Sequence, residues 1–192
     1  VDDIIPSFNN ESIKVFEGTA DVQLYDRQSR KIIKKTVKID KKIFNSSVFM
    51  TGCRTCFFNN KLFISGGKDS SGDKKSFWVY DITNDKLEKL CEMENARSFH
   101  TMMYHENFKS IMVFGGENND TCEMFDIYLN SWSSLPSLNY PRANIQIYFD
   151  KAGTFGYAIC GIIGNITCSL YSEQIELIDF VDINQGWAII EY

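Results

Sequence analysis

The sequence predicts an all-β chain built from four copies of one small antiparallel sheet. In residues 99–135, four short apolar segments are separated by loops rich in Asn, Asp, Gly and Ser, and no helical period connects them. A pair of glycines, an aromatic–Asp pair and a large apolar residue recur along the chain with a period of about 49 residues. Repeats of this length are typical of propeller blades, in which each four-stranded sheet packs against the next.

The second and third copies contain every element of the pattern. Each has paired glycines after an apolar strand, then an aromatic–Asp pair, then a large apolar residue seven positions after the aromatic residue. These elements are Gly66, Gly67, Tyr80, Asp81 and Leu87 in the second copy, and Gly115, Gly116, Phe125, Asp126 and Trp132 in the third.

The first and fourth copies depart from this pattern. In the first copy, Glu17–Gly18 holds the place of the paired glycines, with the first glycine replaced. In the fourth copy, Gly161 is interpreted as the first glycine, and Ile162 as the replacement of the second. Ile178–Asp179 stands there for the aromatic–Asp pair, and Trp187 follows two residues later than the spacing predicts.

Paired glycines after an apolar strand, an aromatic–Asp pair and a Trp, preceded by an Arg with a polar residue three places on, resemble the Kelch repeat. The resemblance covers nearly the whole chain and is most specific in the second and third copies. It implies a Kelch-type β-propeller segment with four recognisable blades, at about residues 1–43, 50–90, 97–135 and 142–192. Because propellers have about four to eight blades, we expect an incomplete or unusually small ring.

The pattern has a structural explanation. Radial blades approach closely near their common axis, where glycine avoids a side chain and permits unusual backbone torsions. The aromatic residues Phe125 and Trp132 should pack between neighbouring sheets, where they bury most area. Arg97 and Arg142 open innermost strands. They could bind loop carbonyls of an adjacent blade or face a partner near the central channel, and the two roles are compatible.

The chain is acidic, with a net charge of −5, yet residues 26–42 carry eight basic and two acidic side chains. One interpretation of this run, from Arg27 to Lys42, is a nucleic-acid-binding patch. The other is the outermost strand of the first blade, where Lys on an exposed edge discourages pairing with another sheet. The run lacks aromatic residues for base stacking, so we favour the edge strand.

Six cysteines could form three disulfides, but a chain with 44% hydrophobic residues does not need them, and we expect free thiols. Cys53 and Cys56 form a single C-x-x-C pair without the further ligands of a zinc site. Four Asn-x-Ser/Thr triplets, starting at Asn10, Asn45, Asn119 and Asn165, leave a secreted alternative. The chain has neither a 20-residue apolar run nor an N-terminal leader. Because free thiols favour a reducing compartment, we expect a cytoplasmic protein.

Catalytic signals are scarce. The two histidines, His100 and His105, form no recognisable triad, and no phosphate-binding loop or H-E-x-x-H motif is present. Among proteins with this blade pattern, galactose-oxidase-like copper enzymes need two His, two Tyr and a Cys, which two histidines on one blade do not supply. We therefore predict no enzyme, no cofactor and no metal, and keep the copper enzyme as an alternative.

The remaining hypothesis is a protein-binding platform, because propellers hold variable loops on a rigid scaffold. Resemblance to Kelch proteins implies a role as a ubiquitin-ligase adaptor attached to a BTB domain, or as a cytoskeletal, actin-associated protein. The predicted partners are proteins, with further blades or self-association closing the ring; neither a membrane nor a nucleic acid is favoured. The predicted partner-facing residues are Asp69, Arg97, Ser98, Asn118, Asn119, Tyr140, Arg142, Asn144 and Asn165.

Overall fold

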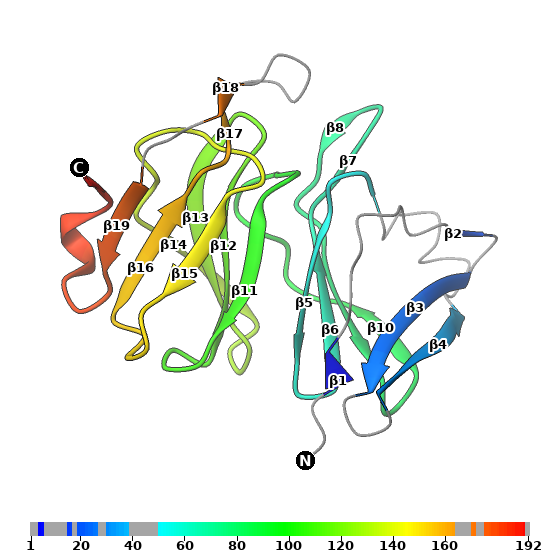
Figure 1. Ribbon diagram of the computed structural model, residues 1–192. Coiled ribbons are helices and arrows are strands. Elements are labelled where there is room, and N and C mark those ends of the chain that lie inside the picture. Colours follow the sequence, from blue (N-terminus) through cyan, green and yellow to red (C-terminus); the bar gives the residue numbers. More distant parts are fainter. Residues whose placement is uncertain are drawn as a thin grey trace.

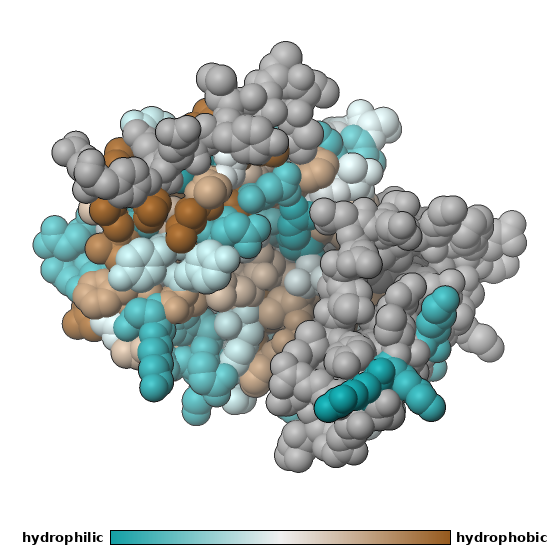
Figure 2. Space-filling model, in the orientation of Figure 1, coloured by the Kyte–Doolittle hydropathy of each residue, from teal (hydrophilic) through white to brown (hydrophobic). Residues whose placement is uncertain are grey.

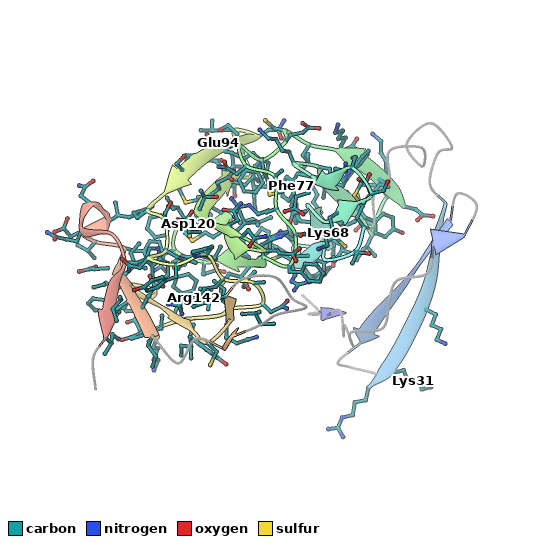
Figure 3. All side chains as sticks on the ribbon, turned by 90° about the horizontal axis from the view of Figure 1, so that it is seen from above. Lys31, Lys68, Phe77, Glu94, Asp120 and Arg142 are labelled. Carbon is teal, nitrogen blue, oxygen red and sulfur yellow. The ribbon has the colours of Figure 1, made fainter. Side chains whose placement is uncertain are left out.

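Four four-stranded antiparallel sheets follow one another along the chain in this computed structural model (Figure 1). The structure describes residues 50–163 and 175–190, and outside these only residues 4–5, 15–16, 19–26, 30–38 and 170–171. Seen from above, the sheets stand side by side around an arc (Figure 3). The prediction of an all-β chain made of four-stranded blades is therefore confirmed.

The third blade is the most regular meander, with each strand paired to the next along the chain. Its second strand is buried along its whole length, because apolar residues on both of its faces contact neighbouring sheets. The strands of this blade are β11 (Thr101–His105), β12 (Ser110–Gly116), β13 (Asn119–Asp126) and β14 (Ser131–Leu135).

The second blade repeats this meander and adds a small hairpin in the loop between its second and third strands. In this hairpin, Lys68 pairs with Asp73 and Asp69 with Gly72. The four main strands are β5 (Arg54–Phe58), β6 (Lys61–Ser65), β9 (Phe77–Asp81) and β10 (Lys86–Lys89), and the hairpin consists of β7 (Lys68–Asp69) and β8 (Gly72–Asp73).

The fourth blade contains a comparable insertion and a longer final turn. A 3-10 turn, η1 (Ile183–Gln185), lies between its last two strands, which explains why Trp187 follows Ile178 later than expected. The main strands are β15 (Gln146–Phe149), β16 (Phe155–Ile159), β19 (Ile175–Asp179) and β20 (Ala188–Ile190), and the insertion contains β17 (Ile162–Ile163) and β18 (Leu170–Tyr171).

The first blade differs from the predicted meander. Both of its first two strands pair with the third, at opposite ends of it, so the second strand does not lie between the first and the third. Glu17–Gly18, the predicted counterpart of the paired glycines, lies outside the described residues. The strands are β1 (Ile4–Ile5), β2 (Val15–Phe16), β3 (Thr19–Asp26) and β4 (Lys31–Lys38).

Apolar cores lie between neighbouring blades. Phe77 of the second blade meets Phe125 and Trp132 of the third at ring-centroid distances of 4.8 and 4.9 Å. Between the third and fourth blades, the rings of Phe114 and Trp187 lie 6.1 Å apart. The predicted packing of the repeated aromatic residues between sheets is thus observed, and each blade is stabilised mainly by the apolar area that it buries against the next.

Candidate functional site

The loops predicted to meet a partner gather at one end of the sheets. Because the strands are antiparallel, the loops between second and third strands and the linkers between blades share this end, which we call the upper end. Hairpins β7–β8 and β17–β18 project from it (Figure 1). The turn at residues 117–118 and the linkers at residues 90–100 and 136–145 complete this surface.

The linkers are joined by backbone hydrogen bonds where they enter the innermost strands. The amide of Phe99 donates to the carbonyl of Gly52, and the amide of Asn144 donates to the carbonyl of Phe99, both at 2.7 Å. Gly52, Phe99 and Asn144 all have positive φ angles, of 72°, 53° and 52° respectively. One repeated backbone geometry therefore places the innermost strands of three blades side by side.

A cluster of polar and charged side chains surrounds Phe99 at the upper end, and we call it the axial cluster. The Lys68 ammonium and the Arg54 guanidinium lie 5.0 and 5.9 Å from the centroid of the Phe99 ring. Lys68 also pairs with Glu117, and Arg54 donates a hydrogen bond to the side chain of Asn144. The cluster joins three blades and offers cationic, aromatic and amide groups at a single place.

Burial lowers the pKa of the Arg54 guanidinium, as expected for a cation partly removed from water. The sequence placed Lys68 in a loop predicted to face a partner but did not single it out as a site residue, and it gave no indication of Arg54. Arg54 belongs to the second copy, whose lead-in lacks the Arg found at positions 97 and 142. The repeat pattern therefore does not mark Arg54 as a site residue. Its position two residues after Gly52 was the signal that could have revealed it.

The paired glycines of the second and third blades lie where each blade closely approaches the next linker, as predicted. The amides of Gly67 and Gly116 donate to the carbonyls of Arg97 and Arg142 in the next linker, each at 2.9 Å. A Cβ atom at Gly115 would lie 2.6 Å from the carbonyl oxygen of Arg142, well inside contact distance. With φ at +61°, this position requires glycine for both torsion and space.

In the fourth blade, the structure corrects the alignment of the glycine pair. Ile162 exchanges backbone hydrogen bonds with Ala143, as Glu117 does in part with Ser98, so Gly161 corresponds to Gly116. Cys160 therefore replaces the first glycine, and Ile162 does not replace the second. The φ of Cys160, +58°, matches that of Gly115, although Cys160 is not a glycine.

The side chain of Arg97 is completely buried. Its guanidinium donates to the carbonyls of Gly115 and Thr121, at 2.8 and 2.7 Å, and forms an ion pair with Glu123. The other contacts of Glu123 are with the linker, whose Glu94 and Asn95 amides donate to it at 2.7 and 3.0 Å. These bonds tie the linker to the third blade.

Arg142 repeats this arrangement one blade further on. It is fully buried, pairs with Glu176, and donates to the carbonyl of Cys160 at 3.2 Å. Glu176 accepts from the amide of Asn139 at 2.7 Å. Of the two predicted roles for these arginines, binding of loop carbonyls is observed, but the carbonyls belong to the blade that each arginine opens and not to an adjacent blade. The partner-facing role needs a correction, because neither guanidinium reaches the surface.

The second blade has uncharged residues at the two positions where the third and fourth blades have the buried arginine and glutamate. Met50 corresponds to Arg97, because the next residue, Thr51, accepts from the amide of Lys68 as Ser98 does from Glu117. Trp78, two residues before the Tyr80–Asp81 pair, corresponds to Glu123. An apolar pair thus replaces the buried ion pair in this blade, and the two positions change together.

The other predicted partner-facing residues divide into two groups. Asp69, Asn118 and Asn144 are exposed at the upper end, and Tyr140 is 38% exposed there. Ser98 is buried and donates to Asp73, and the Asn119 side chain donates to Ala96 and accepts from Thr121. These two residues act within the fold. Asn165 lies outside the described residues.

The described residues show no obvious catalytic constellation. No group of three or more His, Cys, Asp or Glu side chains among them could hold a metal ion. Five described cysteines are free thiols, and burial raises the pKa of Cys56 and Cys122 to about 12. Such thiols stay protonated at neutral pH and are poor nucleophiles.

His100 is buried, with its Nε2 atom 2.6 Å from the hydroxyl of Ser65. Burial, with help from the charge of Arg97, lowers its pKa well below the usual value. The unfolded chain therefore binds a proton below about pH 6.5 that the folded chain does not, and stability falls as the pH falls.

We expect the stabilising contribution of His100 to decline below about pH 6.5, by up to about 1.4 kcal/mol per pH unit. Urea denaturation at several pH values between neutral and mildly acidic should show this decline in the free energy of unfolding. The variant His100→Gln keeps a polar side chain but cannot titrate, so it should have the shallower pH dependence. Identical slopes for both proteins would contradict this assignment.

The basic run contains strand β4, which pairs only with β3 among the described residues and so forms an edge of its sheet. Arg30, Lys31 and Lys34 are exposed. Figure 3 shows Lys31 extending away from the other sheets. This placement agrees with the edge-strand interpretation, in which lysines discourage pairing with another sheet.

Comparison with known proteins supports the repeat assignment. The family described as the Kelch motif matches residues 50–87. A RING finger domain and kelch repeat-containing protein of Dictyostelium discoideum is 27% identical over 134 residues, which cover 67% of this chain and 13% of that protein. An F-box/kelch-repeat protein of Arabidopsis thaliana is 28% identical over 103 residues, covering 52% of this chain and 24% of that protein.

A third relative has the name of an enzyme. The N-(sulfonatooxy)prop-2-enimidothioate sulfolyase of Thlaspi arvense is 26% identical over 123 residues, covering 56% of this chain and 33% of that protein. The match therefore spans a third or less of each of these relatives.

The solved structure of YjhT resembles the fold with a TM-score of 0.70 and 14% identity, covering 97% of this chain and 66% of that one. Within the described part of the chain, no helix is long and apolar enough to cross a membrane. The four successive sheets show the fold of a Kelch-type β-propeller segment, and the chain is similar to Kelch-repeat proteins through the Kelch motif match and two Kelch-repeat relatives.

Proposed function

We propose that this chain is the partner-recognition segment of a Kelch protein, and that its upper end binds another protein. Kelch repeats are generally protein-interaction modules. The observation that carries the proposal is the axial cluster, where Arg54, Lys68 and Phe99 from separate elements meet at one end of the sheets. Exposed polar residues of three blades surround it, which suits a contact of modest area with a polar or acidic segment.

The names of two relatives support a role in ubiquitin transfer. RING finger and F-box are part of those names, and both proteins also carry Kelch repeats. We propose that this chain selects substrates for a ubiquitin ligase, with the catalytic work done by other subunits. Neither relative's name mentions actin, so the cytoskeletal role has no comparable support. The chain itself is proposed to be non-enzymatic and to bind no cofactor.

We further propose that additional blades cover the free face of the fourth blade. Tyr157 pairs with Leu177 in the strand register, as Met112 pairs with Met124 in the third blade. Met112 is buried beneath the fourth blade, and Met124 packs against the same core. Tyr157 and Leu177 are only partly buried, and Tyr148 on the same face is 57% exposed.

Apolar atoms gather on the side of the molecule where the fourth blade lies (Figure 2). A face of this composition requires cover in solution, and a second apolar sheet would supply it.

The free thiols support a reducing compartment, and we propose the cytoplasm. The side chain of Asn119 also argues against the secreted alternative at one of the four Asn-x-Ser/Thr triplets. Its Nδ2 atom donates to the carbonyl of Ala96 at 3.2 Å, so a sugar attached there would break a contact of the fold.

To test the upper end, we would purify the full-length protein from cells and compare it with the variant Lys68→Glu, Asn118→Arg. Both changes lie on the exposed loops around the axial cluster. We expect the variant to lose a specific subset of co-purifying proteins, while ubiquitin-ligase subunits bound elsewhere on the protein remain.

The matched control exchanges the exposed ion pair of strand β10, as Lys86→Glu, Glu88→Lys, away from the upper end. This control should keep every partner and unfold at the same temperature as wild type. An unchanged set of partners in the upper-end variant would refute the proposed surface.

A further inference from the structure

The most exposed large apolar side chains of the described residues lie at the opposite, lower end of the sheets. Tyr128 is 80% exposed, Leu129 74% and Val181 81%. Tyr128 and Leu129 occupy the turn between β13 and β14, and Val181 the turn between β19 and β20. Figure 1 shows the loop that joins β13 and β14 at this end, together with those that join β11 to β12 and β15 to β16.

These side chains are displayed on ordered turns. The carboxylate of Asp126 accepts from the amides of Tyr128 and Leu129 at 2.8 and 2.9 Å, which is an Asx turn. The carboxylate of Asp179 accepts in the same way from the amide of Val181, at 2.8 Å.

The corresponding turn of the second blade has the same hydrogen bond, from the Asn84 amide to Asp81 at 2.9 Å. Its equivalent positions carry Thr83 and Asn84, however, in place of Tyr128 and Leu129. The turn geometry therefore does not require apolar residues, and their exposure in the third and fourth blades needs another explanation.

The third and fourth blades contact each other at this end. Phe108, which is 41% exposed in the turn between β11 and β12, lies 5.6 Å from Phe180 of the fourth blade, measured between ring centroids. In the same turn, Asn107 donates to the carbonyl of Ala152 at 2.6 Å. We call Phe108, Tyr128, Leu129 and Val181 the lower apolar patch.

Acidic residues surround this patch. The turns at the lower end of the third and fourth blades carry five carboxylates and two ammonium groups, a balance of −3. These residues are Glu106, Lys109, Asp126, Asp150, Lys151, Asp179 and Asp182. Two copies of such a surface repel one another, whereas a basic segment is attracted.

We propose that the lower apolar patch binds a basic amphipathic segment of a partner protein. Apolar side chains of that segment would cover Tyr128, Leu129 and Val181, and its Lys or Arg residues would pair with the surrounding carboxylates. This surface lies at the end of the sheets opposite the axial cluster, so the chain could hold two partners at once. The proposal does not depend on the function proposed for the upper end.

The probe is a short fluorescent helix with Leu and Lys at amphipathic spacing, and its binding is measured by fluorescence anisotropy. We expect saturable binding that weakens as salt is added. The variant Tyr128→Thr, Leu129→Asn gives the third blade the turn residues of the second, so it should fold normally. It should bind the probe at least about tenfold more weakly, because it removes two apolar anchors.

Two controls make the result specific. Tyr140→Thr removes a partly exposed aromatic residue at the upper end and should leave binding unchanged. A helix with Glu in place of Lys should not bind. The proposal is wrong if the basic helix shows no saturable binding, or if Tyr140→Thr weakens binding as much as the turn variant does. It is also wrong if wild type dimerises through the patch, shown by dimers in light scattering that the turn variant abolishes.

Discussion

Replacing Arg97 by Met should lower the free energy of unfolding by about 3–5 kcal/mol, the usual cost of removing one partner of a buried ion pair. The substitution leaves Glu123 fully buried and without its cationic partner. The carbonyls of Gly115 and Thr121 also lose a donor. Met nevertheless fits this position in the repeat, since Met50 occupies it in the second blade. The loss of stability should therefore come from the unpaired charge of Glu123 and not from the shape of the new side chain. Urea denaturation measures this change in the free energy of unfolding.

A second change separates the ion pair from the packing. The double variant Arg97→Met, Glu123→Leu removes both charges, so it should be less destabilised than Arg97→Met alone. It should remain below wild type, because the amides of Glu94 and Asn95 lose their acceptor, at a cost of about 1–3 kcal/mol for each amide left unpaired.

Lys86→Ala serves as the exposed comparison, because its partner Glu88 also lies at the surface; we expect a change within about 0.5 kcal/mol. A double variant no more stable than Arg97→Met would show that the isolated charge is not what destabilises the single variant.

The repeated sheets were predictable because their signals are local. Alternating apolar residues predict strands, and Asn, Asp and Gly between them predict turns, without knowledge of distant contacts. The register confirms the spacing rule for the aromatic–Asp pairs, since Tyr80 pairs with Leu87 and Phe125 with Trp132. Trp187 occupies the place equivalent to Trp132 despite its later position in the sequence. Its indole N–H donates to a linker carbonyl at 3.0 Å, as that of Trp132 does at 2.9 Å.

The burial of the two arginines was harder to predict because their partners are distant in sequence. Glu123 lies 26 residues after Arg97, and Glu176 lies 34 residues after Arg142. A signal was nevertheless present in the aligned copies. Each Glu stands two residues before the aromatic–Asp position, and the second copy, which lacks the Arg, has Trp78 there. Because the Arg and the Glu are both replaced in the second copy, the two positions are expected to contact each other. Such a contact favours burial of the arginine over a partner-facing role.

The alignment of the fourth glycine pair failed for a different reason. A sequence shows which residue is glycine but not which residue has a left-handed backbone, and Cys160 adopts that conformation with a φ of +58°. The pairing of β1 with β3 was also beyond reach, because two short apolar segments carry no information about which edge of a sheet they join.

The substitution Gly115→Ala should destabilise the chain by at least about 2 kcal/mol, because two costs add. The left-handed backbone costs an L-residue about 1–2 kcal/mol. The new methyl group would also lie 2.6 Å from the carbonyl oxygen of Arg142, so the fourth blade would have to move away from the third. Chemical denaturation gives the loss, and reduced burial of Trp187 in its fluorescence would reveal the displaced blade.

Gly72→Ala separates the two costs of this substitution. Gly72 also has a positive φ, of +108°, but no other atom lies within 4 Å of the place that the new methyl group would take, so only the torsional cost should appear. Cys160→Gly tests the converse and should stabilise the chain by up to about 1 kcal/mol, because it relieves a left-handed residue. A loss at Gly115 of only about 1 kcal/mol, the torsional cost alone, would mean that the carbonyl of the next linker does not make glycine necessary where the blades meet.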